Sequence, residues 1–132
     1  MKSDKLASYT DSASIKDLKI AVENGSAGEK TAKAAGCTNL IAVQDQGAAL
    51  LEVAAGTSDA CIIDITMANA MTGEGTSYAD LGYQLRLSEE EYGVSFRKDS
   101  DLTAKFNEFM ITLKNDGTLQ ALADKYSLTL AG

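Results

Sequence analysis

The stretch that decides the fold is KIAVENGSAGE, residues 19–29. Its apolar letters IAV predict a buried strand, and the pair Asn24-Gly25 ends it. The small residues 25–28 follow, and a helix is predicted over residues 28–35. A strand, a small-residue turn and a helix leave backbone N–H groups unpaired at the helix N-terminus, where an anion can bind. Taken alone, the same pattern is also typical of an ordinary turn between a strand and a helix.

Length and composition bound the class of protein. The chain has 132 residues, enough for one domain with an apolar core, and 45% of them are hydrophobic. The net charge is −7, and no cluster of Lys and Arg is present, which argues against nucleic-acid and anionic-membrane partners. No apolar run reaches the roughly 18 residues of a membrane span. The start, MKSDKLASYTD, has no apolar core typical of a signal peptide.

The titratable and metal-ligating residues exclude several kinds of chemistry. The chain has no His, which excludes His-based catalytic triads and ordinary zinc sites that contain His. Cys37 and Cys61 are too few and too far apart for a zinc ribbon or a CxxC redox motif. We expect two small buried apolar residues, with a disulfide as the alternative. No metal or cofactor is predicted.

Strands and helices alternate through the first half of the chain. Strands are predicted over residues 19–23, 40–43 and 60–63, and helices over residues 28–35, 48–55 and 66–71. This alternation predicts an α/β fold with a parallel sheet. Before it, residues 1–10 are predicted to be a loose lead-in, and residues 11–18 to contain one helical turn that Ser14 begins.

The second half is predicted to contain two more strands and two helices. Residues 81–87 place Leu or Tyr at every second position, which predicts a strand with one solvated face, and residues 92–96 form a further short strand. Ser100 precedes an amphipathic helix that ends at residues 115–117, and Thr118 begins a last helix.

Two features point to a binding site at one edge of the sheet. In an open parallel sheet, ligands bind beyond the carboxyl ends of the strands. The turn Ser26-Ala27-Gly28 offers amide donors and a hydroxyl there, and Asp64 offers a carboxylate after the third strand. An anion site beside a cation site suits a zwitterion, with the ligand carboxylate on the amides and its ammonium on Asp64. The alternative for Asp64 is N-capping of the following helix, which is compatible with ligand contact.

The sequence resembles the polar amino-acid-binding proteins of bacterial ABC importers. The resemblance rests on KIAVENGSAGE, on ALLEVAAGTSDACIIDITMANAM (residues 49–71) and on the passage from LSEEEYGVSFRKDSDL at residue 87 to residue 128. It runs with few gaps from residue 14 to residue 128. That family is a two-lobed clamp of the periplasmic-binding-protein type 2 fold, with Rossmann-like or flavodoxin-like lobes. The resemblance implies a three-layer α/β lobe over residues 14–92, and a C-terminal segment, residues 93–132, that returns to the first lobe.

The resemblance also implies roles for individual residues. Ser26 and Ala27 stand where the second lobe gives a hydroxyl and an amide to the ligand carboxylate, and Asp64 stands where an acid holds the α-ammonium. Glu23 and Asn24 stand near a position that selects the ligand side chain. After the second strand, Gln44 is a weaker candidate for the rim of the site. Residues 89–92 resemble the approach to the second crossover between lobes.

The family's first lobe has no counterpart in this sequence. In the family, that lobe carries the arginine that pairs with the ligand carboxylate, and neither Arg86 nor Arg97 matches it. We therefore expect roughly half of an extracytoplasmic amino-acid-binding protein, as a fragment, a designed half or a natural truncation. The expected ligand is an amino acid bound weakly, and the full-length parent would serve the membrane subunits of an ABC importer.

Two other functions remain open. One is a structural or designed lobe that folds without a tight ligand. The other is a dehydratase-like enzyme derived from the same fold, in which Glu23, Asp64 and Glu74 supply acid–base groups. Catalysis requires a closed, dry site, and half of a two-lobed clamp does not enclose one. A binding module without catalysis is therefore favoured over an enzyme.

The C-terminal helices predict an uncovered apolar stripe. Leu102, Phe106, Phe109, Met110 and Leu113 share one face of the predicted helix, and in the family this face packs on the first lobe. Such a stripe is too costly to leave in water. Either the helix folds back onto its own sheet, or two chains form a homodimer through residues 101–126, by direct contact or by exchanging the segment after Tyr92. The homodimer is favoured.

Overall fold

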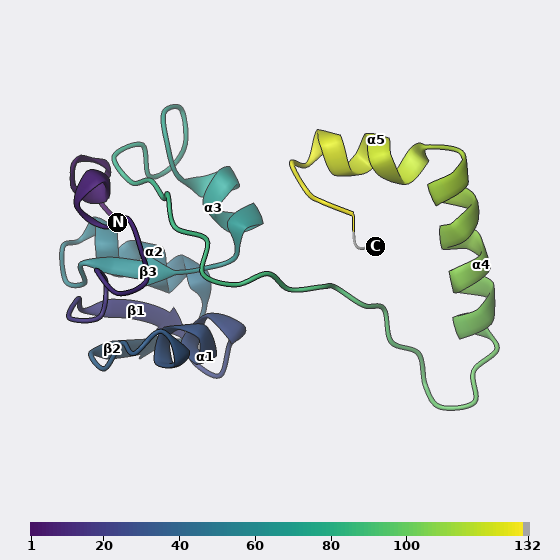
Figure 1. Ribbon diagram of the computed structural model, residues 1–132, viewed down its shortest axis with the longest axis horizontal. Helices are drawn as coiled ribbons and strands as arrows, with labels where there is room; N and C mark the ends of the chain where they lie inside the picture. The colour runs from purple at the N-terminus through teal and green to yellow at the C-terminus, as the bar shows by residue number, and fades with distance from the viewer. Residues whose placement is uncertain (131–132) are drawn as a thin grey trace. The chain divides into compact units, whose positions relative to one another are not determined.

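The computed structural model describes residues 1–130, and their backbone contacts divide the chain into two compact units (Figure 1). The first unit is Met1–Glu89, and the second begins at Glu90. In the first unit lie the 3₁₀ helix η1 (Ser3–Ser8), strands β1 (Ile20–Glu23), β2 (Leu40–Val43) and β3 (Ala60–Ile62), and helices α1 (Ala27–Ala34), α2 (Gln46–Ala54) and α3 (Ile65–Met71). In the second unit lie helices α4 (Leu102–Asn115) and α5 (Thr118–Lys125).

The three strands form a parallel sheet with β1 in the middle, in the order β2-β1-β3. Ile20 pairs with Leu40 on one side and with Ala60 on the other, so the three strands begin level with one another. Since all three run in the same direction, their carboxyl ends meet at one edge of the sheet. Each strand is followed there by the start of a helix, as the sequence predicted.

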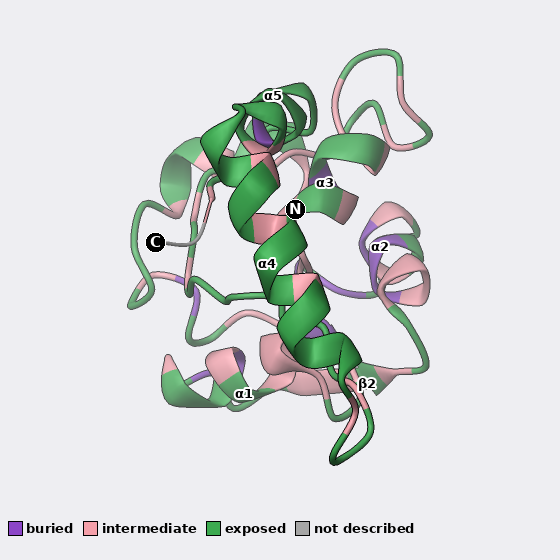
Figure 2. Cartoon of the chain, turned by 90° about the vertical axis from the view of Figure 1, so that its right-hand side faces the viewer, coloured by how far each residue is buried: buried purple, intermediate pink, exposed green. Residues whose placement is uncertain are grey.

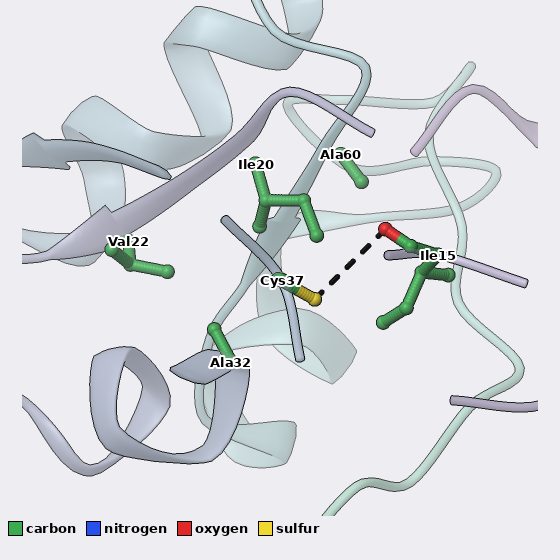
Figure 3. Packing of buried hydrophobic residues seen from close by; sticks show 6 residues of the cluster. All are labelled: Ile15, Ile20, Val22, Ala32, Cys37 and Ala60. Atoms are coloured by element: carbon green, nitrogen blue, oxygen red, sulfur yellow. Dashed lines mark hydrogen bonds between the residues drawn. The ribbon is translucent and has the colours of Figure 1, made fainter. Parts of the chain in front are cut away.

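Side-chain alternation along the strands gives the first unit a core on each face of the sheet. On one face, Ile20, Val22 and Ala60 pack with Ala32 of α1 and with Ile15 and Cys37 (Figure 3). On the other face, Leu50 and Val53 of α2 pack with Leu81, and the half-buried Cys61, Ile63 and Met67 flank them. Helices on both faces of a parallel sheet make the three-layer α/β lobe that the sequence predicted.

Both cysteines are free thiols, and they lie on opposite faces of the sheet. Cys37 is buried in the cluster around Ile20, where its Sγ lies 3.9 Å from the Ile15 carbonyl oxygen (Figure 3). Cys61 is half-buried and packs against the cluster around Leu50. Burial raises the pKa of both thiols. The prediction of small buried apolar residues is confirmed for Cys37, and the sheet between the two thiols prevents a disulfide.

The predictions for residues 1–18 were wrong in detail. The first residues are ordered: η1 forms, Lys2 makes an antiparallel bridge with Leu81, and the Ser3 N–H donates to the Asp80 carbonyl at 2.9 Å. Residues 11–18 form turns without a helix. The Asp11 carboxylate accepts the Ser14 N–H at 2.8 Å, so Asp11 organises this turn by a local side-chain bond that competes with helix formation.

The two strands predicted at residues 81–87 and 92–96 are absent. Between Leu81 and Asp101 the described chain has no regular strand or helix. The alternation at residues 81–87 instead fits the chain to the first unit: Leu81 is buried, and Leu85 and Leu87 are half-buried against the Ile20 cluster. Gln84 donates to the Leu6 and Tyr9 carbonyls through its side chain. A strand needs a partner ladder for its N–H and C=O groups, and the periodicity alone did not supply one.

The second unit is a pair of helices joined at Gly117, whose φ of 82° is the left-handed conformation that favours glycine. The predicted helices are confirmed. Phe106 packs its ring 5.6 Å from that of Phe96, but no residue of α4 is fully buried (Figure 2). Phe109 and Ile111 of α4 are 56% and 59% exposed. The second unit thus presents large apolar side chains on its longer helix.

Candidate functional site

Ser26 begins α1 at the turn after β1. Its backbone is extended, and its hydroxyl oxygen accepts the Glu29 N–H at 3.1 Å, so Ser26 is the N-cap of α1. Among the described residues, the N–H groups of Ala27 and Gly28 have no hydrogen-bond partner. Two free amides and a hydroxyl whose own proton can still be donated therefore stand together at this helix start.

Gly28 brings this turn against β3. A Cβ added at Gly28 would lie 3.0 Å from the Ile62 carbonyl oxygen and 3.4 Å from the Ile62 Cγ2 atom. Contacts this short exclude a side chain without movement of the backbone. The absence of a side chain thus sets the distance between the start of α1 and the end of β3, two residues before Asp64.

The Glu29 carboxylate fixes the conformation of this turn. Its carboxylate accepts the Gly25 N–H at 2.7 Å and bonds to the Lys33 ammonium one helical turn away at 2.5 Å. The Lys33 hydrogen bond, followed by the bond from the Gly25 N–H, lowers the pKa of Glu29. Gly25 has a φ of +75°, a left-handed backbone conformation that residues with a side chain rarely adopt. The turn is therefore held by its own residues before any ligand arrives.

Asp64 stands at the end of β3 as the N-cap of α3. Its carboxylate Oδ1 accepts the Thr66 N–H at 2.7 Å, so the capping interpretation of Asp64 is confirmed. The side chain is half-buried. A carboxylate has two oxygens and about four lone-pair sites, so a capping bond does not by itself exclude a further donor.

The remaining predicted residues lie at the same carboxyl edge. Glu23 is the last residue of β1, pairs in register with Val43 and is half-buried. Asn24 follows it, is exposed, and donates its N–H to the Val43 carbonyl at 2.9 Å. Gln44 follows β2 directly and is exposed. Topology thus brings all six predicted residues to one edge, while their contact with a ligand stays a prediction.

Gln46 is a residue at this edge that the sequence analysis missed. It is the first residue of α2, is half-buried, and its side-chain Oε1 accepts the Asp64 backbone N–H at 2.9 Å. The bond links the ends of β2 and β3, the two strands on either side of β1. Nothing in the local sequence distinguishes Gln46 from an ordinary residue in a helix start, because its partner lies 18 residues away.

Two hollows of the first unit are lined by residues outside this edge. One of about 300 Å³ is lined by Lys2, Ser3, Asp4 and Asp80. Another of about 300 Å³ is lined by Ser12, Thr31, Ala34, Ala35, Leu87 and Ser88. Neither of these two hollows includes a predicted site residue. Glu74 lies exposed in the loop after α3.

Within residues 1–130 no group of three or more Cys, Asp or Glu side chains has a metal-binding arrangement. None of the helices described there is long and apolar enough to cross a membrane.

The fold is that of a lobe of a substrate-binding protein: a parallel sheet between helices, with helix starts and a carboxylate at the carboxyl edge of its strands. Models of known protein families do not match the sequence, and neither do curated proteins.

The structure is similar to a crystal structure of an amino acid ABC transporter substrate-binding protein from Streptococcus pneumoniae Canada MDR_19A bound to L-arginine. The TM-score is 0.73 at 25% sequence identity, over 98% of this chain and 56% of that chain. The likeness supports, at the level of the fold, the family that the sequence resembles. The chain spans little more than half the length of that protein.

Proposed function

We propose that this chain is the amino-acid-binding lobe of a substrate-binding protein that serves an ABC importer. The observation that carries the proposal is the similarity, over 98% of the chain, to an amino acid ABC transporter substrate-binding protein bound to L-arginine. The open helix start and the carboxylate at one sheet edge support it, because they suit the two charged ends of an amino acid.

The turn at Ser26 would bind the ligand carboxylate. The free N–H groups of Ala27 and Gly28 donate to it, and the Ser26 hydroxyl adds a third donor while its oxygen still caps α1. The partial positive charge at the start of α1 favours an anion there. Since Gly25 and Glu29 already hold the turn, little conformational entropy is lost on binding.

Asp64 would bind the ligand ammonium. Its carboxylate stands at the end of the neighbouring strand, where it also caps α3. Glu23 and Asn24, at the end of the central strand just before the Ser26 turn, would face the ligand side chain, and Gln44 would lie at the rim. A cation and an anion held at adjacent strand ends fix the orientation of the amino-acid backbone and leave its side chain to select the ligand.

Binding by this lobe alone is expected to be weak. The chain corresponds to 56% of the matched protein, and the arginine that the family pairs with the carboxylate has no counterpart here. Losing one charge-assisted pair costs on the order of 2 kcal/mol, and the burial that a second lobe provides is lost as well. Together these terms cost several decades of affinity. The parent protein would act outside the cytoplasm and deliver its ligand to the importer's membrane subunits.

Titration of the ¹⁵N-labelled protein with a panel of L-amino acids tests the proposal. We expect millimolar binding, with the largest amide shifts at residues 25–29 and near Asp64. Submicromolar binding to the monomer would contradict the half-site interpretation. If no amide shifts at amino-acid concentrations up to about 50 mM, the alternative of a structural lobe without a ligand would be favoured instead.

The exposed helices of the second unit support a homodimer through residues 101–126. Phe109 and Ile111 of α4, and Leu122 and Tyr126 of α5, are each more than two-fifths exposed, and apolar surface of this kind favours association. Phe109→Glu is expected to shift the mass measured by light scattering from dimer to monomer, while the matched control Lys105→Glu on the same helix leaves it unchanged. A monomeric wild-type protein at high concentration would reject the dimer.

A further inference from the structure

Asp64 is held from two directions in the first unit. Its carboxylate accepts the Thr66 N–H within α3, and its own backbone N–H donates to the Gln46 side chain at 2.9 Å. The first bond is an ordinary helix cap, but the second comes from a different helix, α2. Of the two ends of the Gln46 amide only the oxygen can accept an N–H, so the bond also fixes which way this amide faces.

The Gln46 bond replaces a ladder bond that the sheet does not provide. The pairing of β1 with β3 ends at Val22 and Ile62, two residues before Asp64. The chain must therefore leave the sheet, place Asp64 and begin α3 without a strand carbonyl to receive the Asp64 N–H. Gln46 supplies that acceptor and sets the position of the Asp64 backbone.

The backbone of Gln46 is held in place by the helix to which it belongs. Gln46 is the first residue of α2, whose N-cap Asp45 accepts the Ala48 N–H at 2.8 Å. One turn further on, Leu50 and Val53 are buried against the sheet. Because the backbone of Gln46 is already fixed, its hydrogen bond to Asp64 has to order only the side chain.

We propose that Gln46 is a positioning residue that sets Asp64 for the ligand ammonium, an inference that rests on the proposed function. A charged group binds its partner well only when its own geometry is held by surrounding hydrogen bonds. Gln46 acts through Asp64, so it strengthens the binding of ligands that carry an α-ammonium and not of ligands that lack one. It thereby contributes to selecting amino acids over the corresponding desamino acids.

The first arm of the test needs no ligand. Gln46→Met keeps the length of the side chain and removes the oxygen, and Gln46→Glu restores an oxygen at the same reach. Amide hydrogen exchange at Asp64 is expected to accelerate in Gln46→Met and to return toward the wild-type rate in Gln46→Glu. Gln120→Met, at an exposed position of α5, is the control for adding a methionine. Unchanged exchange in Gln46→Met would overturn the proposal.

The second arm measures binding. Gln46→Met is expected to weaken the affinity for L-arginine roughly fivefold without changing the affinity for its desamino analogue, which has no α-donor for Asp64. In an Asp64→Asn background the same substitution should cost nothing further, because the two residues act as one unit. An equal loss in both backgrounds, or for both ligands, would overturn the positioning role and leave a merely structural one.

The two proposals fail in different ways. If the wild-type protein binds neither L-arginine nor any other amino acid, the proposed function falls and this inference falls with it, whatever the exchange rates. If the wild type binds and Gln46→Met binds equally well, only this inference is overturned. Should Gln46→Met fail to give a folded spectrum, Gln46→Asn, whose shorter side chain cannot reach Asp64, takes its place with the same expected results.

Discussion

Replacing Gly28 with alanine tests whether the close approach of α1 to β3 sets the geometry of the candidate site. The new Cβ would lie 3.0 Å from the Ile62 carbonyl oxygen and 3.4 Å from the Ser26 hydroxyl oxygen. Because the first neighbour is a backbone atom, no rotation of a side chain relieves the contact. The start of α1 must move away from β3 by a few tenths of an ångström.

Two opposing terms set the size of the effect. Alanine is favoured over glycine in a helix by up to about 1 kcal/mol, partly through the unfolded chain. Forcing a methyl group into a packed contact costs about 1–3 kcal/mol. We expect the second term to exceed the first, so that Gly28→Ala lowers the free energy of unfolding by about 1 kcal/mol.

Gly47 offers a matched control. Gly28 and Gly47 are each the second residue of a helix. A Cβ added at Gly47 meets only a side-chain atom, the Asp45 Oδ1 that caps α2, at 3.2 Å, so relief of the contact needs no movement of a neighbouring strand. Gly47→Ala should therefore lower the stability less than Gly28→Ala does.

Urea unfolding followed at the Val22 amide signal reports on the unit that holds the site. The midpoint for Gly28→Ala should fall below that of the wild type and below that of Gly47→Ala. A Gly28→Ala protein as stable as Gly47→Ala would refute the argument that the α1–β3 contact is tight, and with it the role of Gly28 in placing the turn beside Asp64.

Two further predictions concern charges at the same edge. The Lys33 ammonium and the Gly25 N–H lower the pKa of Glu29 below its ordinary value of 4.5. The stability that Glu29 contributes is therefore present above about pH 4.5 and is lost as the pH falls through the lowered pKa. The urea midpoints at pH 6 and pH 3 should differ less in Glu29→Gln than in the wild type, and an equal difference would contradict this role of Glu29. Asp64→Ala removes the cap of α3 and should lower the free energy of unfolding by about 1 kcal/mol, whereas Asp64→Asn keeps a capping oxygen and should change it by a few tenths at most; chemical denaturation that ranks the two variants equally would count against the cap.

The sheet and its flanking helices could be predicted because their signals are local. The apolar run at residues 20–22, the small residues after it and the repeated spacing of strand and helix fix the parallel topology through general rules. The boundaries of β1–β3 and α1–α3 differ from the predicted ones by no more than two residues. The carboxyl edge followed from the same rules, and so the positions of Ser26 and Asp64 could be predicted with it.

The failures have a common physical reason. A period of two at residues 81–87 indicates which side chains are buried, but a strand also requires a neighbouring ladder, and sequence periodicity says nothing of the neighbour. The reverse happened at η1, where polar residues without periodicity are ordered because Lys2 and Ser3 bond to residues about 80 positions away. Gln46 escaped notice for the same reason. Its role depends on a bond across the sheet edge that no local pattern encodes.

The central claim is that Asp64 binds the ammonium of an amino acid, and one comparison tests it most directly. The affinity for L-arginine is measured by NMR titration for the wild type and for Asp64→Asn, which keeps the cap and removes the charge. The account predicts that the wild type binds in the millimolar range and that Asp64→Asn, folded and equally stable, binds at least tenfold more weakly. Equal affinities for the two proteins would contradict it.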